Sequence, residues 1–350
     1  MYALIFALHL AMPARWVDGY VTDPSTGRKL RYRLNGLRVL SVVIAGWALV
    51  CWSGALAWDA FYRERWSMLA GAFVVGVLFT LAIVLPAPRS DARSSLPSDL
   101  YLGRLANPQW RDGFVDAKMY LYLAGAIMLE LNVLSFTAHH WMTFREDPSP
   151  GVFVYAALFT FFVVEYLNFE EVHLYTYDFM AERVGFKLGW GCLVFYPFFY
   201  CVGLWQIAGR PNPHTPAPLL ALLVLMFFGG WVLSRGANLQ KFHFKRDPHA
   251  KAFGLLDPKP LSGGGKHVLT GGFWGLSRHV NYLGEITMAT ALALVLGYPF
   301  ALAPWLYPAY YVALLIPRQI DDDRRCAERY GALWDEYCRR VPYRIIPFLY

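Results

Sequence analysis

The stretch Trp66–Pro88, WSMLAGAFVVGVLFTLAIVLPAP, contains 23 consecutive residues without a charge. A helix needs about 20 such residues to cross the hydrocarbon core of a bilayer. Val39–Trp58 and Leu188–Gly209 are further uncharged runs of 20 and 22 residues. Because the apolar residues are continuous rather than alternating, the runs predict spanning helices and not the strands of a membrane barrel.

The composition of the whole chain also indicates a membrane protein. Of its 350 residues, 57% are hydrophobic and 16% are charged, whereas roughly 25% are charged in soluble domains. A disordered chain, a collagen-like repeat and a small disulfide scaffold are excluded. We expect an all-α, polytopic integral membrane protein with about nine to ten transmembrane helices. The hydrophobic segments lie at residues 1–12, 39–58, 66–86, 119–141, 151–168, 188–209, 217–234, 284–298 and 300–317.

The sequence predicts where helices begin and end in two further segments. Ile286–Pro317 is uncharged over 32 residues, which is too long for one span of about 20. Gly297 and Pro299 therefore predict a tight hairpin of two helices. The polar segment Asp321–Arg340 is expected to form one helix at the membrane surface.

Charge and cysteine content exclude several partners. The net charge is +7, and the basic residues gather beside apolar runs, which is typical of cytosolic flanks and anionic lipid contact. We therefore expect membrane lipids as partners and no nucleic acid. The five cysteines form no CxxC pair, so neither a disulfide framework nor a metal site is expected.

Cationic residues follow the apolar run that ends at Ser234. Lys241 and Lys245 lie four residues apart, so on a helix they share a face that can hold phosphates. Positive-inside anchoring is the simpler alternative for this segment alone.

A dense polar and aromatic stretch precedes the next apolar run. Arg278 and His279 can donate to phosphate, Trp274 and Tyr282 can stack on a base, and Asn281 can bind an amide or a ribose. An aromatic belt with a helix cap would explain the aromatic residues, but not the Arg-His-x-Asn group.

The last polar segment offers two helix faces. Asp322, Cys326 and Arg329 share a polar face. The aromatic face consists of Tyr330, Trp334 and Tyr337.

Acidic residues interrupt the chain near its middle, at Glu170 and Asp178 with Tyr177. An acid in an apolar cavity has a raised pKa and remains protonated near neutrality, as a proton donor to an apolar substrate must. Solvated acids in an interfacial loop are an equally good interpretation.

Taken together, these segments resemble the sterol reductase family, which includes Δ14, Δ7 and Δ24(28) reductases and the membrane domain of the lamin B receptor. Asp99–Pro108 is similar to its first signature, with Gln109 in place of an Arg. The central block is similar at Glu170, Glu171, Leu174, Asp178, Gly185 and Phe186. The second signature is similar at Cys326, Tyr330, Gly331, Trp334, Tyr337 and Val341–Arg344. The chain departs from the family at Phe169, where Asn is usual, and at Cys192, where ring-reducing members have Asp.

The resemblance implies NADPH as hydride donor, bound on the cytosolic side. Residues 1–350 would form one domain, with the sterol side in 1–210 and the NADPH part in 211–350. No GxGxxG motif occurs, so the cofactor pocket would lie between helices. The implied cofactor residues are Lys241, Lys245, Leu269, Trp274, Arg278, Asn281, Tyr282, Asp322, Cys326, Arg329, Tyr330 and Tyr337.

The implied reaction is an ionic reduction of a sterol carbon–carbon double bond. An enzyme acid protonates the alkene to a tertiary carbocation, and NADPH then delivers hydride. The site must exclude water and hold an oriented donor. The candidates for the proton donor are Glu170, Asp178, and Tyr177 or Tyr337 hydrogen-bonded to an acid. Within the family the Δ14 bond is the default substrate, and Δ7 or Δ24(28) are alternatives.

Two other classes of protein remain open. Membrane methyltransferases that use S-adenosylmethionine have a similar Arg-His-x-x-Tyr segment, and a non-catalytic sterol-binding protein would share the fold. The expected location is the endoplasmic reticulum or a bacterial inner membrane, and the oligomeric state is left open.

Overall fold

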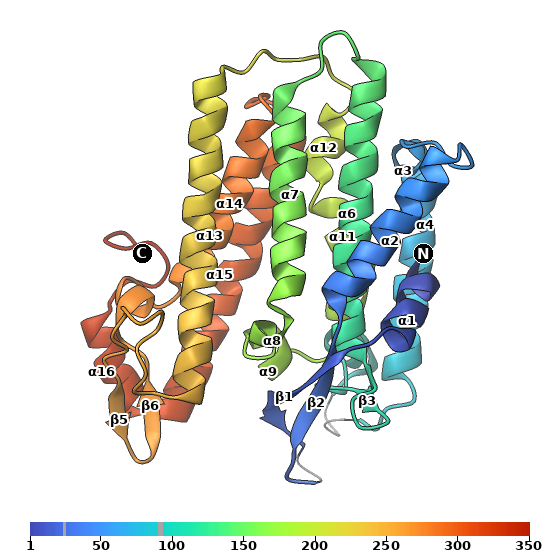
Figure 1. The fold of residues 1–350 in the computed structure, drawn as a ribbon. Helices are drawn as coiled ribbons and strands as arrows, with labels where there is room; N and C mark the ends of the chain where they lie inside the picture. The colour runs from blue at the N-terminus through green and yellow to red at the C-terminus, as the bar shows by residue number, and fades with distance from the viewer. Residues whose placement is uncertain (24–25, 90–93) are drawn as a thin grey trace. The chain divides into compact units, whose positions relative to one another are not determined.

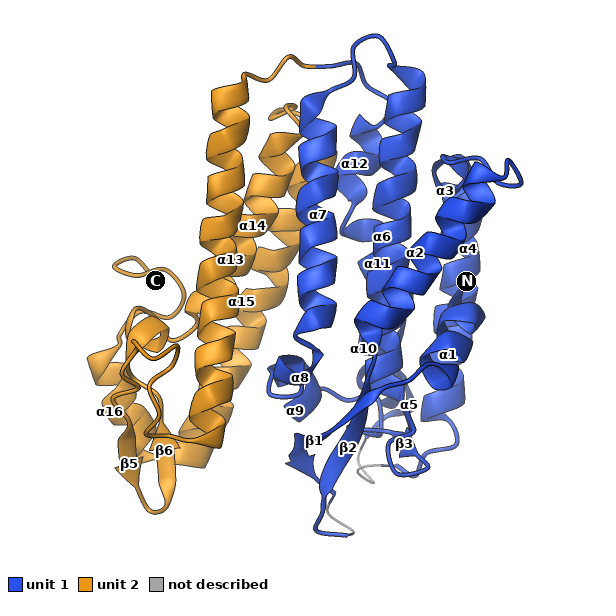
Figure 2. Ribbon diagram, viewed as in Figure 1, with its two compact units in different colours: residues 1–212 blue, residues 213–350 orange. Residues whose placement is uncertain are grey.

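The computed structural model describes residues 1–23, 26–89 and 94–350, and it is predominantly helical (Figure 1). The chain divides into two compact units, Met1–Asn212 and Pro213–Tyr350 (Figure 2). Among the described residues, five helical segments are long and apolar enough to cross a membrane: Arg65–Val84, Ala117–Thr143, Pro150–Asn168, Phe186–Ile207 and Ala217–Arg246. The all-α, multi-span fold class is confirmed, and the number of nine to ten spans stays a prediction.

The first unit contains most of the helices. Its long helices are α2 (Gly36–Trp52), α4 (Arg65–Val84), α6 (Ala117–Thr143) and α7 (Pro150–Asn168). Its shorter helices are α1 (Tyr2–Ala11), α3 (Ala60–Arg63), α5 (Leu96–Leu102), α8 (Glu170–His173), α9 (Tyr177–Met180), α10 (Phe186–Trp190), the π-helix η1 (Gly191–Phe195), α11 (Tyr196–Phe199) and α12 (Val202–Ile207).

Helix α6 forms the centre of this unit, because it packs against α1, α3, α7 and α11. The Asp116 side chain caps its first turn by accepting from the Met119 N–H at 2.7 Å, which satisfies a donor that the helix leaves open. A Cβ on Gly125 would lie 2.5 Å from the Tyr196 ring. Glycine at this position therefore allows α11 to approach α6 closely.

The first hydrophobic segment forms α1, which has 10 residues. A helix of that length rises about 15 Å, roughly half the thickness of the hydrocarbon core. Helix α1 is therefore too short to cross the membrane as a straight helix.

The basic stretch Arg15–Leu34, which lies beside an apolar run, forms a β-hairpin. Strand β1 (Arg15–Thr22) pairs antiparallel with β2 (Lys29–Leu34), and Trp16 lies opposite Arg33. A short second ladder pairs β3 (Gln109–Trp110) with β4 (Val115–Asp116).

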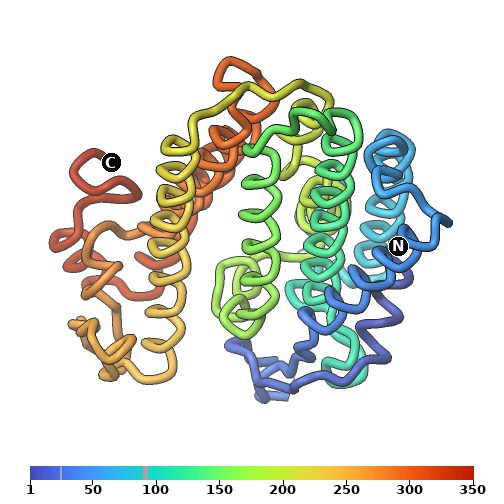
Figure 3. The backbone as a smooth tube through the Cα atoms, turned by 45° about the horizontal axis from the view of Figure 1, so that its top comes forward, coloured from blue at the N-terminus to red at the C-terminus, as the bar shows by residue number. Residues whose placement is uncertain are grey.

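The second unit consists of three long helices and a small polar subdomain. Its elements are α13 (Ala217–Arg246), β5 (Leu261–Gly263), β6 (Lys266–Val268), the 3₁₀ helix η2 (Gly272–Gly275), α14 (Val280–Val295), α15 (Leu302–Tyr330) and α16 (Ala332–Arg340). Figure 3 shows the chain passing along α13, through the β5–β6 hairpin and back along α14. A Cβ on Gly284 would lie 2.5 Å from the Gly230 carbonyl oxygen, so the absence of a side chain lets α13 and α14 touch.

Of the two predictions about helix boundaries, one is confirmed and the other is wrong. The helical hairpin is confirmed, since α14 ends at Val295 and α15 begins at Leu302. The single polar helix over Asp321–Arg340 is wrong: α15 continues to Tyr330, and the chain breaks at Gly331, where φ is +54°. This region of backbone space favours glycine, so α16 leaves in a new direction.

Candidate functional site

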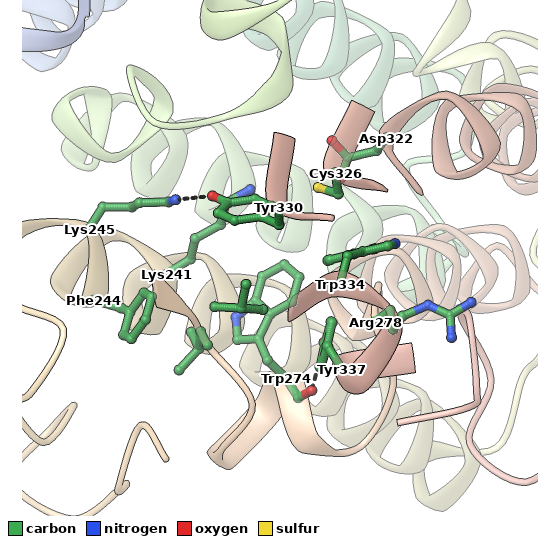
Figure 4. A pocket seen from close by; sticks show the side chains of 12 residues that line it. Lys241, Phe244, Lys245, Trp274, Arg278, Asp322, Cys326, Tyr330, Trp334 and Tyr337 are labelled. Carbon is green, nitrogen blue, oxygen red and sulfur yellow. Dashed lines mark hydrogen bonds between the residues drawn. The ribbon is translucent and has the colours of Figure 1, made fainter. Parts of the chain in front are cut away.

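A cavity of about 80 Å³ opens among α13, η2, α15 and α16 of the second unit (Figure 4). It is smaller than the roughly 300–1,000 Å³ typical of ligand pockets, so it can enclose only part of a large ligand. Its lining residues are Lys241, Phe244, Lys245, Val268, Leu269, Trp274, Arg278, Asp322, Cys326, Tyr330, Trp334 and Tyr337. Nine of these twelve were predicted as cofactor residues, and their role toward a cofactor stays a prediction.

Three predicted cofactor residues do not line the cavity. The Asn281 amide instead donates to the Asn238 side chain at 3.3 Å. The Tyr282 ring lies 5.0 Å from the His279 ring, and the Arg329 guanidinium lies over the Tyr330 ring at 5.5 Å.

Three lining residues were not predicted as cofactor contacts. Phe244 lies between Lys241 and Lys245 on the same face of α13, so helical spacing from Lys241 was a usable signal. Val268 precedes Leu269 in the chain and ends β6. Trp334 belongs to the aromatic helix face that the sequence predicts.

Helix α13 supplies the cationic side of the cavity. The Lys245 ammonium donates to the Tyr330 hydroxyl at 2.9 Å (Figure 4). The Lys241 ammonium lies over the Trp274 ring, 5.5 Å from its centroid. Within the described parts of the chain no ion pair includes Lys241, although its charge acts on Asp322, so an anionic ligand could approach its ammonium.

Aromatic side chains form another wall. The Tyr337 hydroxyl donates to the Trp274 carbonyl at 2.8 Å, and the Trp334 and Tyr337 rings lie 5.1 Å apart. Tyr337 is only 1% exposed, and burial raises the pKa of its phenol. The phenol therefore keeps its proton, but that proton is already donated to the main chain.

Arg278 and His279 are held by the protein itself. The Arg278 guanidinium donates to the Val341 carbonyl at 2.9 Å and pairs with Asp323 at 3.3 Å. The predicted phosphate contact of Arg278 would therefore compete with these partners. His279 bonds to Asp322 through Nε2 at 3.3 Å.

The electrostatic environment of Asp322 favours its charged form. Burial acts to raise the pKa of Asp322, but the His279 hydrogen bond and the Lys241 charge outweigh it and hold the pKa below its usual value. Burial also raises the pKa of the nearby Cys326 thiol to about 12. The cavity thus carries an ionised carboxylate and a neutral thiol near neutral pH.

Several buried polar atoms around the cavity have no protein partner in the described chain: Arg278 Nε, His279 Nδ1, Asn281 Oδ1 and Asp323 Oδ1. Buried polar groups are normally satisfied by protein, water or a ligand. Of these four residues only Arg278 lines the cavity. The cationic and aromatic lining suits a ligand that is anionic and contains flat rings.

The candidate acid Glu170 lies in the first unit, at the start of α8. Its Oε2 accepts from the Gly36 N–H at 3.1 Å. Burial raises the pKa of Glu170 to about 7, against the opposing effects of the Gly36 hydrogen bond and the Arg15 charge. The neighbouring Glu171 instead forms an ion pair with Arg15 at 2.8 Å.

Tyr177 and Asp178 begin α9 in the same unit, and a buried lysine fixes this segment. The Lys118 ammonium donates to the Asp178 carbonyl at 2.7 Å and to the Glu182 carbonyl at 2.8 Å. Lys118 is fully buried, so these carbonyls replace its hydration. Of the four candidate acids, Tyr337 alone belongs to the second unit.

The charged residues of the Asp99–Pro108 stretch have a structural role. Arg104 bonds to Asp99 at 2.8 Å through Nε. Its Nη1 donates to the Val84 carbonyl at 3.1 Å and to the Ala87 carbonyl at 2.8 Å. Arg104 thereby satisfies main-chain acceptors at the end of α4, which the helix itself leaves open.

The fold and the cavity define a polytopic helical membrane protein whose cavity suits an anionic, ring-containing ligand. The chain belongs to the ergosterol biosynthesis ERG4/ERG24 family, whose sequence model matches residues 1–350. The expected family is thereby confirmed.

Individual relatives match along nearly the whole chain. A Delta(14)-sterol reductase of Arabidopsis thaliana is 31% identical over 367 residues, covering 100% of this chain and 96% of the relative. The Delta(14)-sterol reductase TM7SF2 of Mus musculus is 33% identical, and the match covers 98% of this chain and 82% of the relative. A Delta(14)-sterol reductase of the bacterium Methylotuvimicrobium alcaliphilum is 31% identical, and the match covers 98% of this chain and 80% of the relative.

Proposed function

We propose that this chain is an NADPH-dependent sterol reductase of sterol biosynthesis and that it reduces the Δ14 double bond. The observation that carries the proposal is the cavity of the second unit. It combines the cations of α13 with aromatic faces, in a chain whose relatives are named Delta(14)-sterol reductases.

The residues of this cavity fit a phosphorylated dinucleotide. Lys241 and Lys245 would hold phosphate oxygens, since Lys241 has no ion pair in the described chain. Trp274 and Tyr330 offer ring faces beside these cations. The cavity would enclose only part of such a ligand, and the rest of the dinucleotide would follow its open mouth.

A bound nicotinamide would supply the hydride. The chain must supply the proton, and among the four candidate acids we favour Glu170. Its environment raises its pKa to about 7, so a large fraction carries a proton near neutrality. Tyr337 has already committed its proton to the Trp274 carbonyl. Burial of Glu170, which is 8% exposed, also limits competing water.

The substrate would reach the protein from the bilayer, as expected for a sterol. The cofactor site would face the cytosol. The membrane would be the endoplasmic reticulum in a eukaryote or the inner membrane in a bacterium, and relatives come from both kinds of organism.

The test is turnover of the reconstituted full chain with a panel of Δ14, Δ7, Δ24 and Δ24(28) sterols and NADPH, analysed by mass spectrometry. We expect the Δ14 sterol to gain two hydrogens. With deuterated NADPH one deuterium should enter the product, and in D₂O a second should enter at the adjacent carbon. Gain of two hydrogens at another double bond would replace Δ14 as the proposed site of reduction.

The same preparation tests the other two classes. No reduced sterol, together with displacement of bound NADPH by S-adenosylmethionine, would favour a methyltransferase. Sterol binding without turnover would favour a non-catalytic protein.

A further inference from the structure

The second unit contains a structural marker of the membrane boundary. Helix α13 is uncharged from Ala217 to Ser234, and Arg235 is its first charged residue. Asn281 in the first turn of α14 bonds to Asn238 at 3.3 Å. The start of α14 therefore lies at the level where α13 changes from apolar to charged, which is where a spanning helix meets the headgroups.

Three successive residues before α14 bind a segment near position 345. The Ser277 hydroxyl donates to the Ile345 carbonyl at 2.8 Å. The Arg278 N–H donates to the Tyr343 carbonyl at 3.0 Å, and the next N–H, of His279, donates to the Arg344 carbonyl at 2.8 Å. These bonds hold residues 343–345 at the level of the membrane boundary.

Residues 345–350 then form a tight loop, which we name the 345–350 loop. The main-chain oxygen of Tyr350 accepts from the N–H groups of Arg344, Ile345 and Ile346 at 2.8, 2.8 and 3.0 Å. The Tyr350 hydroxyl also bonds to Gln319 at 3.4 Å. The loop is therefore closed on itself and held to α15.

The tip of this loop exposes large apolar side chains. Phe348 is 87% exposed and Leu349 is 78% exposed. Ile346 adds a partly exposed side chain, and the exposed Arg344 lies at the base of the loop. Adjacent exposed apolar residues next to a cation are typical of segments that enter the interfacial region of a bilayer.

We propose that the 345–350 loop inserts into the bilayer, with Phe348 and Leu349 among the upper acyl chains and Arg344 near lipid phosphates. The occupant of this surface is the lipid bilayer, because the loop is fastened to the start of an apolar helix at the boundary. The Arg278 guanidinium also binds the Val341 carbonyl. Insertion would therefore fix one wall of the cavity relative to the membrane.

The test places a photoreactive p-benzoylphenylalanine at position 348 of the full chain in phosphatidylcholine–phosphatidylglycerol nanodiscs. The matched control places it at Leu255, which is 83% exposed but follows the charged end of α13. After irradiation, mass spectrometry should detect lipid adducts at 348 and far fewer at 255. Equal adduct yields, or a covalent dimer of the chain at 348, would overturn the proposal.

A second measurement uses substitutions alone. The bilayer should raise the apparent Tm of the chain relative to lipid-free detergent, and F348S/L349S should reduce this increment. The control L255S should leave the increment unchanged. The proposal fails if both variants retain the full increment, since both sites are exposed and neither substitution opens a core.

Discussion

The backbones of Gly103 and Gly185 lie directly against each other. A Cβ on Gly185 would be 2.3 Å from the Gly103 nitrogen, and a Cβ on Gly103 would be 2.4 Å from the Val184 carbonyl carbon. Gly103 also has a φ of +92°. These two glycines come from two separate stretches that resemble the family signatures, so one contact explains why both stretches contain glycine.

G103A should destabilise the protein. The added methyl group would meet backbone rather than a flexible side chain, and the positive φ disfavours alanine, so we expect a loss of about 2 kcal/mol or more. The measurement is the apparent Tm and the monodisperse yield in detergent.

The control for this variant is G46A. Gly46 lies inside α2 and a Cβ there would meet nothing within 4 Å. Alanine in a helix interior gains up to about 1 kcal/mol over glycine, so G46A should keep or raise the Tm. A Tm of G103A equal to that of G46A would refute the role of the contact.

K241A should weaken NADPH binding. Lys241 is the cavity cation without an ion pair in the described chain, so its removal should raise the Kd about tenfold, or about 1.4 kcal/mol. Isothermal titration checks this, with K251A as the control because Lys251 is exposed and does not line the cavity. Unchanged affinity in K241A would remove Lys241 from the binding site.

Y337F separates a structural role of Tyr337 from a catalytic one. Loss of this part-buried hydrogen bond to the Trp274 carbonyl should cost about 1 kcal/mol of stability. If the hydroxyl only supports the cavity wall, kcat should fall at most severalfold. Loss of all turnover in a folded Y337F would instead identify Tyr337 as the proton donor.

The pKa of Glu170 predicts a pH-dependent stability. Its pKa is raised from 4.5 to about 7 in the folded state, so between these values the folded chain binds more protons than the unfolded chain. Stability should therefore fall as the pH rises through this window, by roughly 3 kcal/mol in total. Denaturant titrations from pH 4.5 to 8 should show this slope, and E170Q should flatten it.

The same residue predicts a pH dependence of catalysis. If Glu170 supplies the proton, kcat/KM should decline above about pH 7 as the carboxyl ionises, and E170Q should be inactive while folded. Full activity of E170Q would return the assignment to Asp178, Tyr177 or Tyr337.

Local patterns in the sequence were sufficient for the spans and for much of the cavity. Apolar length predicts helices such as α4, and helical spacing places Lys241 and Lys245 on one face. Trp274 and Tyr330 are also brought to the cavity as expected. Such features depend on residues that are near neighbours in the chain or share one helix.

Features set by long-range contacts were not predictable in this way. The basic stretch Arg15–Leu34 pairs with itself as a hairpin, which charge counting does not show. The break at Gly331 depends on a backbone angle that composition does not specify. Likewise, the commitment of the Arg278 guanidinium to Val341 joins residues that are far apart in the chain.

The continuity of helix α13 links its uncharged half to the two lysines of the cavity. It is one continuous helix of 30 residues, with an uncharged half from Ala217 to Ser234 and a half that carries Lys241 and Lys245. No break separates the uncharged half from the two lysines. A tilt of α13, which is a usual response of a spanning helix to bilayer thickness, would therefore move Lys241 and Lys245 together.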